Sequence, residues 1–123
     1  MEQFFKSIVE TDTAPIVICN TEHEIIYLNK TAAERYAKRG GYSLVGKSLF
    51  DCHNEESNCK IRKVVDWFKA SRENNRIFTY HNPRENKDVY MIALRNDSGE
   101  LIGYYEKHEY RTPETSKPYG ACE

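Results

Sequence analysis

Short apolar runs separated by polar turns dominate the first third of the chain. Residues 16–18 (IVI) and 25–28 (IIYL) predict two strands, and the polar residues 20–24 between them predict a turn. Asn29 follows the second run directly, where its side chain can accept from the first free amides of a helix. The Ala-rich stretch after it, with glycines at positions 40 and 41, predicts a short helix over residues 29–38.

The rest of the chain predicts a longer helix followed by three strands. Ile61, Val64, Val65 and Phe68 recur at the i, i+3, i+4, i+7 spacing of an amphipathic helix, which predicts a helix over residues 57–71. Residues 76–81, 88–94 and 101–110 are β-rich runs, and the sequences between them contain Asn, Pro, Asp or Gly. Strands joined in this way favour antiparallel pairing, so the pattern predicts an α+β fold.

The two ends of the chain differ from this central domain. An apolar stripe in residues 1–12 predicts an N-terminal flanking helix that either packs on its own sheet or pairs with a second copy in a homodimer; the stripe comprises Phe4, Phe5, Ile8 and Val9. Residues 113–123 are polar and Pro-containing, which predicts a disordered tail. The domain itself is therefore expected over residues 13–112.

Composition narrows the classes of partner. With 123 residues, 30% of them charged, and a net charge of −1, the chain offers one modest core and no charge excess for nucleic acid or an anionic membrane. The sequence contains neither an apolar run long enough to span a membrane nor a signal-peptide pattern at its start. Four cysteines in this setting indicate free thiols. We expect a cytoplasmic protein that binds neither nucleic acid nor membranes.

The order of the local motifs resembles the PAS domain family. A hairpin leads into an N-x-x-A helix start (residues 29–32), and the loop GKSLFD (residues 46–51) leads toward the next helix. The sequence RNDSGELIGYYE (residues 95–106) is similar to the family's closing hairpin. The resemblance covers residues 8–112 and implies a five-stranded antiparallel sheet with helices on one face. It also implies a sensor or signalling module that dimerises, binds a small molecule in an internal pocket and signals to a partner protein in trans.

Two segments depart from the family pattern. The first hairpin turn carries Thr21-Glu22-His23-Glu24 where relatives usually have a glycine. His23 is expected to be exposed there. The last strand ends Glu109-Tyr110-Arg111-Thr112 instead of the Asp-Ile-Thr motif found in many relatives. Because this motif is absent, the family's usual output mechanism is not carried over to this chain.

A ligand, if one binds, is expected between the predicted helix 57–71 and the central strands, under the irregular loop 46–58. The predicted contacts are Phe50, Cys52, His53, Val64, Phe68, Met91 and Tyr105, with Cys52 and His53 at the rim. A strand shifted by one residue would replace Met91 by a neighbour and Tyr105 by Tyr104. The identity of the ligand stays open, because such pockets are lined by ordinary apolar side chains.

The main candidates for metal or haem binding are Cys52 and His53, with Cys59 further along. Their C-H-x5-C spacing matches no zinc template, so the alternative is a loop His with small packed thiols. The Cys-His pair after GKSLFD resembles PAS domains of anaerobic bacteria that accompany hemerythrin-like domains. Leu49 stands where flavin-binding relatives carry a reactive cysteine, which argues against flavin.

The sequence gives no support to an enzyme. It lacks a nucleophile elbow, a Walker loop, an HExxH helix and a dinucleotide-binding glycine pattern. Its acidic and His residues are scattered and not paired. Two functions besides the ligand-binding sensor therefore stay open: a ligand-free protein–protein interaction module, and a haem or metal redox sensor that uses Cys52 and His53.

Overall fold

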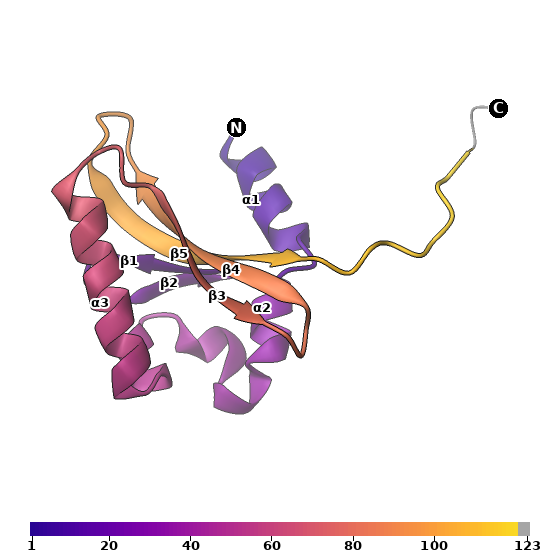
Figure 1. The fold of residues 1–123 in the computed structure, drawn as a ribbon, viewed down its shortest axis with the longest axis horizontal. Coiled ribbons are helices and arrows are strands. Elements are labelled where there is room, and N and C mark those ends of the chain that lie inside the picture. The colour runs from indigo at the N-terminus through magenta and orange to yellow at the C-terminus, as the bar shows by residue number, and fades with distance from the viewer. Residues whose placement is uncertain (121–123) are drawn as a thin grey trace.

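A computed structural model describes residues 1–120 and contains a five-stranded antiparallel sheet with the strand order β2-β1-β5-β4-β3 (Figure 1). Helix α3 and a segment of short helices cover one face of this sheet. The predicted α+β fold and its antiparallel sheet are confirmed. The elements are α1 (Glu2–Thr11), β1 (Val17–Asn20), β2 (Ile25–Leu28), α2 (Lys30–Arg35), the 3₁₀ helices η1 (Ala37–Arg39), η2 (Gly41–Leu44) and η3 (Leu49–Cys52), α3 (Glu55–Ala70), β3 (Arg76–Asn82), β4 (Lys87–Arg95) and β5 (Leu101–Tyr110).

The predicted helix over residues 29–38 is shorter than expected. Asn29 is its N-cap, as predicted, and accepts a hydrogen bond of 2.9 Å from the amide of Ala32. The α-helix ends at Arg35, and residues 37–39 form the 3₁₀ helix η1 before Gly40, which has a φ of 123°. Such tighter turns are common where a helix ends. The chain thus leaves α2 early and turns through η2 and η3 beside the sheet.

Helix α3 begins two residues before the predicted position. Asn54 is the N-cap, and its side chain accepts from the amide of Ser57 at 2.8 Å. The predicted apolar stripe does face the sheet and is buried there: Ile61, Val64, Val65 and Phe68. Together with side chains of β1, β2, β4 and β5 this stripe forms the core.

Two central strands approach each other closely at Gly103. Asn20 pairs with Gly103 and Cys19 with Tyr104 in the β1–β5 register. A Cβ atom at Gly103 would collide with the carbonyl oxygen of Cys19. Only glycine therefore allows the two backbones to pair at this distance.

The fully buried side chain of Asn29 holds three segments together. Besides capping α2, its carboxamide oxygen accepts from the amide of Ile16 at 3.0 Å. Its nitrogen donates to the carbonyl of Val9 and the carbonyl of Ala14, each at 3.0 Å. Asn29 thus ties the end of α1 and the chain entering β1 to the start of α2.

Helix α1 stands apart from the α3 side of the sheet, near the start of β1 (Figure 1). Within residues 1–120 none of its side chains is buried, and Phe4, Phe5 and Ile8 are 61–69% exposed. Residues 113–120 are exposed and form no helix or strand; the last three residues of the predicted tail lie outside the described residues. No helix in the described part of the chain is long and apolar enough to cross a membrane.

Candidate functional site

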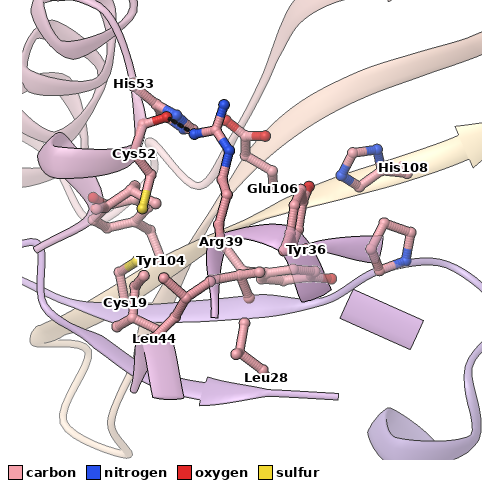
Figure 2. A pocket seen from close by; sticks show the side chains of 15 residues that line it. Cys19, Leu28, Tyr36, Arg39, Leu44, Cys52, His53, Tyr104, Glu106 and His108 are labelled. Carbon is pink, nitrogen blue, oxygen red and sulfur yellow. Dashed lines mark hydrogen bonds between the residues drawn. The ribbon is translucent and has the colours of Figure 1, made fainter. Parts of the chain in front are cut away.

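A cavity of about 230 Å³ lies between the inner face of the sheet and the segment of short helices (Figure 2). The sheet contributes residues from β1, β2 and β5, and the cover comes from Tyr36, directly after α2, and from η1, η2 and η3. The lining residues are Pro15, Val17, Cys19, Ile25, Leu28, Tyr36, Arg39, Leu44, Leu49, Cys52, His53, Tyr104, Tyr105, Glu106 and His108. The sequence places these groups here because strands alternate their side chains between faces: Tyr104, Glu106 and His108 share the inner face of β5.

The cavity has one apolar side and one polar side. In Figure 2, Cys19, Leu28 and Leu44 lie along one side, while Arg39, His53, Glu106 and His108 lie along the other. Arg39 donates a 2.6 Å hydrogen bond from Nη1 to the carbonyl of Cys52. This bond ties η1 to η3 across the rim. A small molecule with an apolar body and a polar end would match this division.

Glu106 and His108 dominate the electrostatics of the polar side. Burial raises the pKa of Glu106, against the lowering effect of the charges of Lys87 and Lys60. Burial, together with the positive charges of Lys87 and Arg35, lowers the pKa of His108 to about 4. The imidazole is therefore neutral near pH 7. Its Nδ1 is shielded from solvent and has no hydrogen-bond partner among residues 1–120.

A more open groove of about 400 Å³ continues from this polar side toward β3. The cavity and the groove share four lining residues: Tyr36, His53, Glu106 and His108. The groove also contains the buried Lys87, whose Nζ lies 3.1 Å from the carboxylate of Glu85. Arg35 holds the same carboxylate through two bonds of 2.7 and 2.6 Å. Charged groups thus surround the entrance that leads to Glu106 and His108.

The structure brings only some of the predicted contacts together. Cys52, His53 and Tyr105 border the cavity, and Met91 borders the adjoining groove. Tyr105 points to the opposite face from Tyr104 by strand alternation, so the inward aromatic side chain is Tyr104, which is 1% exposed. The predicted contact Tyr105 therefore borders the cavity together with the more deeply buried Tyr104, and Met91 in β4 is buried on the inner face.

Helix α3 borders the groove but not the cavity: Glu56, Ser57, Lys60 and Ile61 line the groove. Val64 and Phe68 of α3 are buried in the core and do not line the cavity, because α3 packs directly on the sheet. Phe50 does not line it either: its ring packs 4.3 Å from that of His23, with the guanidinium of Arg62 4.5 Å from its centroid. The cavity lies beside β1 and β5, under the short helices, and the groove lies between α3 and the strands β3, β4 and β5.

Sequence reasoning also missed the role of His23. The expectation that it is exposed is wrong, because its Nδ1 lies 2.7 Å from the hydroxyl of the buried Tyr104 and its ring packs on Phe50. Burial has the largest effect and lowers the pKa of His23, and the positive charges of Lys69 and Arg62 lower this pKa further. His23 has a φ of 65°, the left-handed conformation that glycine adopts easily. The one sequence feature that could have indicated this role is the absence of the usual glycine from the first hairpin turn.

Cys52 and His53 border the cavity, but the described residues do not build a metal site around them. Among residues 1–120 no group of three or more His, Cys, Asp or Glu side chains could hold a metal ion. Cys19, Cys52 and Cys59 are free thiols, and Cys59 is exposed on α3. The fourth cysteine lies outside the described residues.

Comparisons with known proteins agree with this fold. The family model described as "PAS domain" matches residues 13–106. The C-terminal domain of a Streptococcus mutans protein aligns with a TM-score of 0.68 at 20% identity, over 89% of this chain and 84% of that one. The PAS domain of a Colwellia psychrerythraea protein gives 0.64 at 12% identity, over 90% and 97%. A sensory box sensor histidine kinase structure from Vibrio cholerae gives 0.55 at 13% identity, over 90% and 93%. A comparison with curated proteins gave no match.

Proposed function

The chain belongs to the PAS domain family, a family of sensory and signalling modules, and we propose that it is a non-catalytic sensor that binds a small molecule in the cavity beneath its short helices. The observation that carries the proposal is the cavity itself, about 230 Å³ with an apolar side and a polar side. Well-packed interiors leave few voids larger than a water molecule. A space of this size inside a small domain therefore favours a ligand-binding function over a purely structural one.

The contacts of Asn29 favour a route from the cavity to the N-terminal helix. Tyr36 borders the cavity directly after α2, whose first turn Asn29 caps. The same side chain donates to the carbonyl of Val9 at the end of α1. A ligand that shifts α2 would alter these hydrogen bonds, and with them the position of α1.

The exposed stripe of α1 favours a homodimer as the signalling form. Phe4, Phe5 and Ile8 are all more than half exposed in the single chain, whereas Val9 is half-buried. Covering such a stripe is favourable, because each Å² of apolar surface removed from water contributes about 25 cal/mol of stabilisation. A second copy of α1 would supply a matching surface, because a twofold interface uses the same patch twice.

The remaining parts of the proposal concern location and output. The free thiols of Cys19, Cys52 and Cys59 favour the reducing cytoplasm. The family resemblance further favours a partner protein in trans that reads the state of the dimer. Co-purification of such a partner with the parent chain, but not with a monomeric variant, would support this step.

Binding in the cavity is tested by filling it. Leu49 lines the cavity, so Leu49→Trp should occupy its apolar side, whereas Val45→Trp adds the same ring at an exposed position. Xenon is a suitable probe because it binds in apolar cavities, and one side of this cavity is apolar. We expect the parent and V45W to bind xenon, measured by NMR, and L49W to lose binding. Equal responses in all three proteins would favour the ligand-free interaction module. An absorption spectrum of the purified protein tests the haem alternative.

A further inference from the structure

Glu106 and His108 form an unusual pair on the inner face of β5. Both side chains border the cavity and the adjoining groove. The Nδ1 of His108 is buried with no hydrogen-bond partner among the described residues. The influences on Glu106 are burial and the charges of two lysines, and no hydrogen bond is among them. Both side chains therefore border the cavity, and neither has a hydrogen-bond partner among the described residues.

Buried polar groups without partners are costly, so a ligand that satisfies both would gain affinity. The Glu106 carboxyl group accepts hydrogen bonds. The neutral imidazole of His108 carries one N–H and can donate from it. The two side chains are two residues apart on one face of a strand, which places their Cα atoms about 7 Å apart. A head group with an N–H donor beside a C=O acceptor would satisfy both.

The charges around the polar side argue against an ionised head group. Arg39 borders the cavity, and Lys60 and Lys87 border the groove on the other side of Glu106. A cationic head beside the Glu106 carboxylate would also meet these three positive groups, and an anionic head beside the positive groups would also meet that carboxylate, so neither charge would be fully compensated. Burying either charge without a dedicated partner is expensive. A neutral head avoids both costs.

The dimensions of the cavity suit a body of about one ring. An apolar cavity of about 150 Å³ holds benzene, and the present cavity of about 230 Å³ leaves additional room for a small head group. Its apolar side is formed by aliphatic residues of β1, β2, η2 and η3, among them Val17, Leu28 and Leu44. The space and the polarity thus match a single apolar ring with one polar substituent.

We propose that the cavity takes a small neutral ligand with a ring-sized apolar body and a carboxamide-type head, whose N–H donates to the Glu106 carboxyl group and whose carbonyl accepts from the imidazole N–H of His108. This inference rests on the proposed ligand-binding function and adds the chemical class of the ligand. The class includes primary and secondary amides, lactams and nitrogen heterocycles that present a donor next to an acceptor.

Four probes with the same phenyl body separate the possible head groups. Benzamide is neutral with donor and acceptor, benzoate is anionic, benzylamine is cationic and ethylbenzene is apolar. Each is titrated into the full ¹⁵N-labelled chain at pH 7 and followed by NMR shifts of residues around the cavity. We expect benzamide to bind about tenfold or more tightly than the other three, as two buried hydrogen bonds would give.

Substitutions assign the head group to its partners. In Glu106→Leu and in His108→Leu, affinity for benzamide should fall about tenfold while affinity for ethylbenzene holds or rises. Glu106→Gln keeps an acceptor oxygen and should retain most of the benzamide affinity. Glu73→Leu, at an exposed position in the turn before β3, is the matched control and should change nothing. The amide spectrum of each variant checks that it is folded.

The outcomes separate this inference from the function beneath it. If benzoate, benzylamine or ethylbenzene binds most tightly, the carboxamide class is wrong, although the cavity still binds ligands. If benzamide binds best but E106L and H108L leave its affinity unchanged, the assignment of the head group to these residues is wrong. If no probe binds and xenon does not enter the parent either, the ligand-binding function itself fails.

Discussion

Nδ1 of His23 lies 2.7 Å from the hydroxyl of Tyr104 and joins the β1–β2 turn to the central strand β5 across 81 residues of sequence. Tyr104 is 1% exposed and lines the cavity, so its hydroxyl requires a partner inside the protein. The turn places His23 there through a left-handed backbone conformation. The bond therefore fixes one wall of the cavity to the hairpin that closes it.

Tyr104→Phe should lower the free energy of unfolding by about 1–2 kcal/mol, because it removes a buried hydrogen bond and leaves Nδ1 of His23 without its partner. Urea denaturation followed by circular dichroism measures this change. Tyr105→Phe is the control: it removes the same atom from the next residue, on the opposite face of β5, and should cost less than about 0.5 kcal/mol. Equal effects of the two substitutions would contradict the role of the bond.

Gly103→Ala should destabilise the fold by about 3 kcal/mol or more, since its Cβ would collide with the backbone carbonyl of Cys19 and force β1 away from β5. Gly46→Ala provides a comparison at a glycine with a φ of 93° and open space around it. There only the backbone strain of about 1–2 kcal/mol is expected. Thermal unfolding of both variants measures the difference, and a G103A protein as stable as G46A would refute the close approach.

Asn29→Ala should cost about 3 kcal/mol or more, because it removes the cap of α2 and leaves several buried backbone groups without partners. Asn54→Ala removes a cap with the same geometry from an exposed position, and about 1 kcal/mol is expected there. Hydrogen exchange adds a second measurement. The amides of α1 should exchange faster in N29A but not in N54A. Equal exchange in the two variants would show that α1 is held by contacts other than those of Asn29.

Acidification should destabilise the protein through His108. The pKa of its imidazole is lowered by burial to about 4 from a usual value of 6.5. Between these values the unfolded chain binds a proton that the folded chain does not, so the free energy of unfolding falls as the pH falls through this window. Between pH 7 and pH 5 the loss is about 1 kcal/mol, allowing for the partial exposure of the ring.

His108→Gln removes this contribution, so its stability should change less between pH 7 and pH 5 than that of the parent. Urea denaturation at the two pH values gives both differences. Glu106 acts in the opposite sense, because burial raises its pKa. For this reason the test compares the variant with the parent and does not use the parent alone. An unchanged pH dependence in H108Q would show that His108 is not the responsible group.

Ile8→Glu should convert a homodimer into a monomer, because it places a charge in the exposed stripe of α1. Ser7→Glu introduces the same charge at the neighbouring position outside that stripe and should leave the dimer intact. Sedimentation velocity measures both. A monomeric parent, or an I8E protein that remains a dimer, would count against the proposed interface.

Long, periodic elements could be predicted from the sequence. The stripe on α3 and the capping role of Asn29 are local patterns, and both are confirmed. The inward face of β5 could not be assigned, since Tyr104 and Tyr105 place an aromatic ring on each face. The position of the cavity was harder to predict than the sheet. Its cover is the irregular segment over residues 37–52, which contains the three 3₁₀ helices η1, η2 and η3. That path has no periodicity and depends on left-handed glycines such as Gly40 and Gly46.

The position of β5 has a consequence for how the protein forms during synthesis. This strand is the last element among residues 1–120, yet it lies between β1 and β4 at the centre of the sheet. Until residues 101–110 have left the ribosome, the β1–β2 hairpin and the β3–β4 hairpin have no strand to join them. The ribosome synthesises a chain at about 5–20 residues per second. Both hairpins therefore keep unpaired edge strands until β5 has been made. Folding of this sheet is therefore completed only after residues 101–110 have been made.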